Sequence, residues 1–291
     1  MNRTEVRDLL LEAADSAYKE FNDKLANCDT APSIGVRVPE IRRIAKEAVK
    51  NGWEEYLSEM ETLAQMEDLA GLPLLQEEHM LQGIVIGSAR MTDEARVQHL
   101  DRWVPGILSW ADCDCSVSSM KFMKKNQDFW FAYNTGWLMK KGGDSGKASL
   151  IRPFTVRFAL VALMQYFIND TYIDRVLELF AFPFGRTEAN ASPVKEDGQA
   201  ADVSRMKENG QAADMPRMKE NGQAAGGDDY YIRMAQAWAL SVCFVKYRDK
   251  TLRLLEERCM DAWVQNKAIQ KCRESYRVSA EDKELLKLLK I

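Results

Sequence analysis

Helical periodicity is the feature of this chain that most restricts its fold. Apolar residues recur every three to four positions through most of the sequence, and the first segment places Leu9, Leu10, Ala13, Ala17 and Phe21 on one stripe. Alternating β-branched runs joined by hairpin turns, which are typical of β-strands, are nearly absent. The chain is therefore expected to be all-α.

The periodic segments are of moderate length and are joined by short loops. About a dozen helices that pair in sequence predict a HEAT-like helical-repeat solenoid, an α-α superhelix, whose units of two or three helices have degenerate sequences. The expected helices lie at about 4–25, 39–51, 53–65, 75–90, 93–108, 116–126, 128–141, 149–167, 170–181, 229–247, 250–263, 264–277 and 280–290.

One segment departs from this pattern. Residues 191–202, 203–214 and 215–226 are three copies of a polar 12-residue unit, of which the second reads VSRMKENGQAAD. The unit has almost no large apolar side chain, so it cannot bury enough surface to offset the entropy lost on ordering. The sequence therefore predicts one helical domain, formed by 1–187 and 229–291, with a flexible low-complexity insertion at 188–228.

The charge is unevenly distributed along the chain. The net charge is −4, but residues 1–109 hold 12 Lys+Arg against 20 Asp+Glu, whereas 230–291 hold 13 against 8. A basic concave face is therefore compatible with an acidic protein. The first 21 residues are amphipathic and carry acids, unlike a signal peptide, and apolar stretches such as Phe158–Phe167 are too short to span a bilayer. A cytoplasmic location and no membrane contact are expected.

The cysteines and histidines do not indicate a metal centre. None of the six cysteines forms a CxxC pair, and His79 and His99 are the only histidines. A zinc site needs about four such ligands at defined spacing, so reduced and mostly buried thiols are expected instead. The nucleotide-binding loops GxGxxG and the P-loop, the GxSxG and HExxH motifs and the protein-kinase motifs are absent, and no cofactor is expected.

Three local features point to chemistry, and each has a structural alternative. Trp110 is followed by the two acids Asp112 and Asp114, which could instead cap a helix. Arg157 lies inside an apolar helix, where its charge needs a carboxylate from a neighbouring helix. Trp238 lies among small residues on a helix and could equally be a core side chain.

Taken in order, these segments resemble the DNA alkylation-repair family of AlkD-like, HEAT-repeat DNA glycosylases. The resemblance spans the chain except for 188–228, and it depends on five motifs that are weak singly and fairly specific together. The matching segments are Trp110-x3-Asp114, Arg157-Phe158-Ala159, 231–238 (YIRMAQAW), 34–47 (IGVRVPEIRRIAKE) and the basic segment 266–275 (NKAIQKCRES).

The resemblance implies a metal-independent DNA N-glycosylase, a hydrolase of N-glycosyl bonds that excises alkylated, cationic N3- or N7-methyl purines. It implies catalytic roles for Asp114, Trp110, Arg157 and Trp238. Where the family usually has an acid directly after the Trp, this chain has Ala111, and Asp112 follows. Asp112 therefore remains an alternative to Asp114 as the essential carboxylate.

The implied partner is double-stranded DNA with alkylated bases, and the default oligomeric state is a monomer. Concave helical arrays contact the duplex backbone through Lys and Arg with little sequence reading. The alternatives are a non-catalytic HEAT-like nucleic-acid-binding module and a helical protein scaffold. The candidate phosphate contacts are Lys121, Lys124 and Lys125, expected on one helical face, and Arg152, Lys246, Lys267, Lys271 and Arg273.

Overall fold

The computed structural model describes residues 1–25, 32–65, 74–139, 153–184 and 229–291. Within these ranges the chain forms fourteen α-helices, two short 3-10 helices and no strand, which confirms the all-α prediction. The 12-residue repeats of the predicted insertion lie outside the described residues.

The described ranges contain a succession of helices. The first seven are α1 (Arg3–Glu12), α2 (Ser16–Leu25), α3 (Val38–Lys50), α4 (Trp53–Gln65), α5 (Gln76–Ser88), α6 (Asp93–Trp103) and α7 (Trp110–Val117). The other seven are α8 (Gln127–Met139), α9 (Pro153–Tyr166), α10 (Ile173–Ala181), α11 (Asp229–Lys246), α12 (Arg248–Glu257), α13 (Ala262–Glu274) and α14 (Ala280–Lys287). The 3-10 helices are η2 (Val104–Gly106), after α6, and η3 (Lys121–Lys124), after α7.

The single helix expected at 4–25 is in fact two, because the chain turns between α1 and α2. Asp15 stabilises this break locally, since its Oδ1 accepts a hydrogen bond from the backbone N–H of Tyr18 at 3.0 Å. Its other carboxylate oxygen lies 3.0 Å from Nη2 of Arg37, just before α3. The break therefore depends partly on a contact 22 residues away in sequence.

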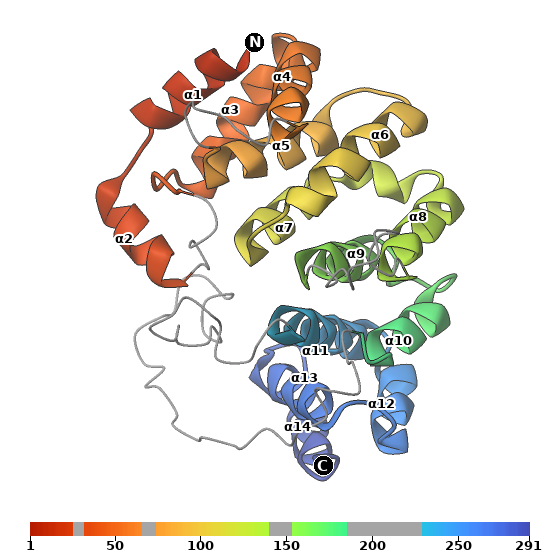
Figure 1. Cartoon of the computed structure of the whole chain (residues 1–291). Helices are drawn as coiled ribbons and strands as arrows, with labels where there is room; N and C mark the ends of the chain where they lie inside the picture. The colour runs from red at the N-terminus through yellow and green to blue at the C-terminus, as the bar shows by residue number, and fades with distance from the viewer. Residues whose placement is uncertain (26–31, 66–73, 140–152, 185–228) are drawn as a thin grey trace, which may run out of the picture.

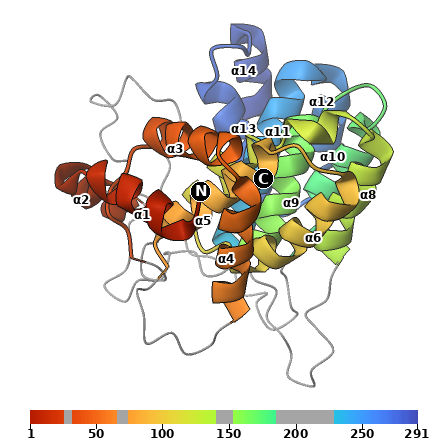
Figure 2. The ribbon, with the colours of Figure 1, turned by 90° about the horizontal axis from the view of Figure 1, so that it is seen from above.

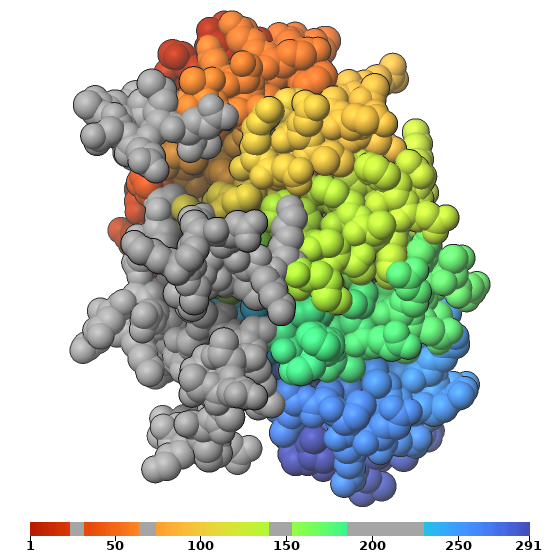
Figure 3. Space-filling model, turned by 45° about the vertical axis from the view of Figure 1, so that its right-hand side comes forward, coloured from red at the N-terminus to blue at the C-terminus, as the bar shows by residue number. Residues whose placement is uncertain are grey.

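The odd-numbered helices form a row in which each packs against the next. This succession runs from α1 through α3, α5, α7, α9 and α11 to α13. The even-numbered helices from α4 to α12 pack on this row, and Figure 1 shows α6, α8, α10 and α12 along its outer, right-hand side. Figure 2 shows the N-terminal helices α1, α3 and α4 in front of the later ones. The surface in Figure 3 is a series of bands in chain order from top to bottom.

One continuous core connects the row. Its largest fully buried side chains are aromatic and come from helices along the array, including Tyr56, Trp103, Trp130, Phe158 and Phe180. The rings of Trp103 and Phe158 meet edge to face with centroids 6.0 Å apart, joining α6 to α9. None of the described helices combines the length and apolar character that a membrane span needs.

Candidate active site

The helix that carries the predicted catalytic acids begins earlier than expected. α7 starts at Trp110, and the Ser109 hydroxyl caps it by accepting from the backbone N–H of Asp112 at 3.0 Å. The helix expected at 116–126 is therefore wrong at its start, and the acids do not cap it. Because Ser109 satisfies the helix start, the carboxylates of Asp112 and Asp114 are available for other contacts.

The two acids lie in different environments, because positions two apart on a helix point about 200° away from each other. Asp112 is 2% exposed, and its Oδ2 lies 2.6 Å from Nδ1 of His79 on α5. The His79 ring in turn stacks on Trp103, with centroids 5.3 Å apart. The side chain of Asp114 is 16% exposed. Asp114 is therefore the acid that solvent or a ligand can reach.

Arg157 is the buried partner of Asp114, and a carboxylate on a neighbouring helix is what its sequence context predicted. Its Nη2 and Nε lie 2.6 Å from Oδ2 and 3.0 Å from Oδ1 of Asp114, so the pair is bidentate. Nη1 donates to the backbone carbonyl of Tyr231 at 3.0 Å. One guanidinium thus joins α7, α9 and α11.

The electrostatics of this pair favour the charged state of the arginine. Burial by itself would lower the pKa of the Arg157 guanidinium, since only 5% of the residue is exposed. The adjacent Asp114 carboxylate reverses this effect through its charge and its hydrogen bonds, and the pKa lies above its ordinary value. Arg157 is therefore a fixed cation behind the Asp114 carboxylate.

The two predicted tryptophans lie on the same series of helices. Trp110 is four residues before Asp114 on α7, which places the two on one helix face, one turn apart. Trp238 lies on α11, seven residues after Tyr231. Both indoles are half-buried and pack against the core. The four candidate catalytic residues therefore occupy α7, α9 and α11, three consecutive helices of the inner row.

A family model for DNA alkylation repair enzymes matches residues 6–138, from α1 to the end of α8. Over this range, which is less than half of the chain, the sequence is similar to the DNA alkylation repair enzyme family. The matched range contains Trp110 and Asp114, whereas Arg157 and Trp238 lie beyond it. No curated protein and no solved structure matches the chain.

The phosphate contacts predicted from the sequence are spread over three places. Lys121, Lys124 and Lys125 are exposed, but they do not share a face of an α-helix as predicted, because the chain there forms η3 and Lys125 follows it in extended conformation. Lys246 is exposed at the end of α11, and Arg152 lies outside the described residues. On α13, Lys267, Lys271 and Arg273 are half-buried.

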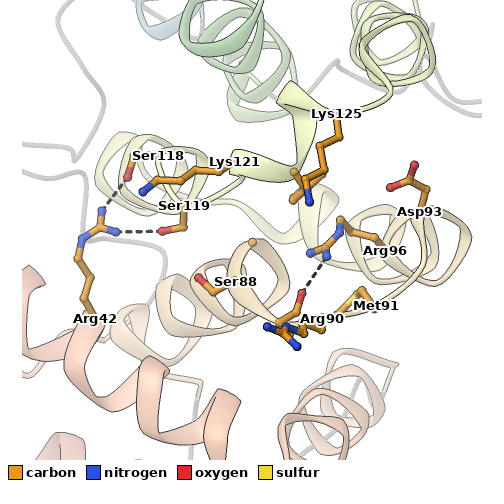
Figure 4. Close-up of a pocket in the computed structure, with 13 residues that line it drawn as sticks. Arg42, Ser88, Arg90, Met91, Asp93, Arg96, Ser118, Ser119, Lys121 and Lys125 are labelled. Atoms are coloured by element: carbon orange, nitrogen blue, oxygen red, sulfur yellow. Dashed lines mark hydrogen bonds between the residues drawn. The ribbon is translucent and has the colours of Figure 1, made fainter.

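A pocket that sequence reasoning missed lies between α3, the end of α5, the start of α6 and the end of α7 (Figure 4). Its volume is about 900 Å³. It is lined by Arg42, Gly87, Ser88, Ala89, Arg90, Met91, Asp93, Arg96, Ser118, Ser119, Lys121, Phe122 and Lys125. Three of these residues had a signal in the sequence. Arg42 lies in the Pro-x-x-Arg part of a family-like segment, and Lys121 and Lys125 were predicted phosphate contacts.

The described residues contain no group of three or more His, Cys, Asp or Glu side chains that could hold a metal ion. Their cysteines are unpaired, and burial raises the pKa of the Cys115 thiol, next to Asp114, to about 11. Cys113 is fully buried, and its thiol pKa is also raised by burial. Neither thiol is therefore in the reactive thiolate form near neutral pH.

Proposed function

We propose that this protein is a DNA glycosylase that excises purines alkylated at N3 or N7 from duplex DNA. One observation carries the proposal. Asp114 is partly exposed on its helix while a buried arginine holds both of its carboxylate oxygens from behind. This arrangement fixes the position of the carboxylate and favours its charged form, and it presents the carboxylate toward the surface.

The chemistry of the substrate explains why such a site suffices. A purine alkylated at N3 or N7 carries a formal positive charge, so its glycosidic bond is weak and the base leaves as a neutral molecule. Breaking this bond builds positive charge on the deoxyribose ring, as in other oxocarbenium-like transition states. The catalyst must stabilise a cation and place a water molecule, and it need not protonate the leaving group.

Asp114 and Arg157 divide this work. A carboxylate has about four lone-pair directions, and Arg157 occupies two of them. The remaining directions are available to orient a water molecule and to face the developing sugar cation. The pair is a dipole with its positive end buried and its negative end toward the surface, which is the preorganised polarity that the transition state needs.

The tryptophans and the array supply binding. The faces of Trp110 and Trp238 carry negative π charge and would attract the cationic base or sugar. We infer that the described helices form a HEAT-like α-α superhelix, because each inner helix packs on the next and the outer helices cover one side of the row. Such an array contacts duplex DNA mainly through backbone phosphates.

The test is release of base from duplex DNA that contains N7-methylguanine or N3-methyladenine. The parent protein should release base, and Asp114→Asn should abolish release while it leaves DNA affinity nearly intact, because the amide keeps the shape but loses the charge. Asp249→Asn is the matched control, since Asp249 is an exposed carboxylate on the outer helix α12. It should behave as the parent does.

Two other outcomes would replace this function. Salt-sensitive DNA binding without release of either base would indicate a non-catalytic nucleic-acid-binding relative. Absence of any salt-sensitive DNA binding would favour a protein scaffold, because phosphate contacts always weaken as salt rises.

A further inference from the structure

The 13-residue pocket is a site of its own, close to the candidate active site but distinct from it. Ser118 and Ser119, in its wall, follow Asp114 by about one turn along and beyond α7. Since a helix rises about 1.5 Å per residue, the pocket wall begins roughly 6 Å along α7 from Asp114. A ligand that reaches Asp114 could therefore also reach this pocket.

Two arginines build the wall of the pocket. Arg42 crosses from α3 to the end of α7, where it donates to the Cys115 carbonyl at 2.9 Å and to the hydroxyls of Ser118 and Ser119 at 2.7 and 2.9 Å. Arg96 donates to the Ala89 carbonyl at 2.8 Å and to the carbonyl of Ile86.

The Arg96 guanidinium also lies over the Phe122 ring, 4.1 Å from its centroid. Burial lowers the pKa of Arg96 to about 10, so it remains charged at neutral pH. Arg42 and Arg96 therefore add positive charge to the wall while the Nη1 and Nη2 atoms of both donate to protein oxygens.

Three further cations line the pocket without partners of their own. Arg90, Lys121 and Lys125 are exposed, and within the described part of the chain their side chains make no hydrogen bond or ion pair. Figure 4 shows Lys121 and Lys125 on one side of the pocket, opposite Arg42 and Arg90. Because these donors are unengaged and lie near like charges, an anion would relieve their mutual repulsion.

The lining has little negative charge to offset these cations. Its one carboxylate among the described residues is Asp93, whose Oδ2 accepts from Nδ2 of Asn126 at 3.1 Å. Five cationic side chains therefore face one acid, in a part of the chain whose first 109 residues carry more acids than bases. The local field is positive even though the segment is acidic.

We propose that this pocket binds one backbone phosphodiester of the lesion-bearing DNA strand, with Arg90, Lys121 and Lys125 as its ligands. The inference rests on the proposed function, because it takes DNA as the substrate. A volume of about 900 Å³ leaves room for the nucleotides on either side of the phosphate. The short distance from Asp114 places that phosphate within a few nucleotides of the target base, where it fixes the register of the strand.

The first test is the salt dependence of binding to undamaged duplex DNA, which does not depend on base excision. Each neutralised phosphate contributes about 0.9 to the slope of log K against log salt. The triple variant Arg90→Gln/Lys121→Gln/Lys125→Gln should lower the magnitude of this slope by about 1, because the three cations share one phosphate. Three independent contacts would lower it by about 3 instead, which would overturn a single site.

A matched control removes charge elsewhere. Arg253 and Lys290 are exposed cations on α12 and after α14, and the double variant Arg253→Gln/Lys290→Gln should keep the slope of the parent. The pocket and control variants change only exposed side chains, so circular dichroism should show the same helical content in both. A pocket variant with the slope of the control would overturn the proposal.

The second test locates the phosphate. A duplex with one abasic-site analogue fixes the register, and neutral methylphosphonate linkages are placed one at a time on either strand. One position near the analogue on the same strand should weaken binding of the parent but not of the triple variant. Sensitivity only on the opposite strand, or the same sensitivity in both proteins, would overturn the assignment.

These results separate the inference from the proposed function. Loss of slope in the pocket variant, without base release by the parent, would keep the phosphate site and reject the glycosylase. Base release by the parent, with an unchanged slope in the pocket variant, would keep the glycosylase and reject the phosphate site. If inorganic phosphate raised the melting temperature of the parent but not of the pocket variant, at matched ionic strength and with no change in the DNA slope, the ligand would be a free phosphate and the DNA assignment would fall.

Discussion

His79 and Asp112 form a polar pair in the buried interface between α5 and α7, with Nδ1 of His79 2.6 Å from Oδ2 of Asp112. The backbone carbonyl of His79 also accepts from the indole Nε1 of Trp103 at 2.9 Å. The other carboxylate oxygen of Asp112 is buried and makes no hydrogen bond. The pair therefore fixes how α7, which carries Asp114, lies against α5.

Loss of the imidazole should be costly for this interface. In His79→Ala the Asp112 carboxylate stays buried and loses its hydrogen-bond partner, and Trp103 loses its stacked ring. We expect the free energy of unfolding to fall by about 2–4 kcal/mol. Urea denaturation followed by circular dichroism measures it. The milder Asp112→Asn, whose amide oxygen can still accept from His79, should cost clearly less, and equal losses would contradict this account.

The same pair decides which carboxylate is needed for activity. Asp112→Asn keeps a hydrogen bond to His79 inside the protein, and Asp112 is too buried to meet substrate. Base release should therefore persist in Asp112→Asn and disappear in Asp114→Asn. Single-turnover rates on methylated duplex DNA make the comparison, and the reverse ranking of the two variants would move the catalytic role to Asp112.

Arg157 should not tolerate a conservative change. A lysine keeps the charge but cannot donate in parallel to both oxygens of Asp114 and also reach the carbonyl of Tyr231. In Arg157→Lys we expect stability to fall by about 1–3 kcal/mol and base release to fall with it, since Asp114 loses its fixed orientation. Denaturant titration and single-turnover rates measure the two effects. Parent-like rates would show that Asp114 needs no positioning by Arg157.

Much of the fold was predictable from the sequence, because amphipathic stripes, and the residues that begin and end helices, mark most of the helices. The ranges expected at 53–65 and 229–247 agree with α4 and α11 to within one residue. The break between α1 and α2 was not predictable, since it involves the contact of Asp15 with Arg37. The start of α7 was also missed. Ser109 caps this helix, but two nearby acids are equally good capping residues in general, so the sequence did not show which residue is the cap.

The candidate site was predictable only in part. An arginine inside an apolar helix demands a carboxylate, and the structure supplies Asp114. The choice between Asp112 and Asp114 required the true start of α7, which sets the direction in which each points. The basic pocket was hidden for another reason. Arg42, Arg90 and Lys121 come from separate segments of the sequence. A net charge summed over a long segment does not show that these three cations lie together in the fold.

Close contact between α5 and α7 depends on Gly83. A Cβ there would lie 2.3 Å from Cζ2 of Trp103 and 2.6 Å from Oγ of Ser116, so Gly83→Ala forces the interface apart. We expect a loss of about 1–3 kcal/mol in the free energy of unfolding. Gly136 on α8 is the matched control, because apart from the backbone of its own helix no atom of the described residues lies within 4 Å of a Cβ added there. Gly136→Ala should stabilise the protein by up to about 1 kcal/mol. A change in the free energy of unfolding with the same sign in both variants would be inconsistent with this packing.

Alkylation of the Cys115 thiol would report on the surface beside Asp114. It is half-buried, and burial raises its pKa to about 11, whereas Cys259 is exposed after the end of α12. Because the thiolate is the reactive form, alkylation of Cys115 should be slow at pH 7 and should rise roughly tenfold per pH unit until about pH 11.

The same measurement also tests where DNA lies. Bound duplex DNA should slow the alkylation of Cys115 further and leave the alkylation of Cys259 unchanged, because Cys115 adjoins Asp114, the proposed catalytic residue, and Cys259 does not. Mass spectrometry of the modified peptides follows each thiol separately. Equal protection of both thiols would indicate a global change on binding, and protection of neither would place the DNA away from α7.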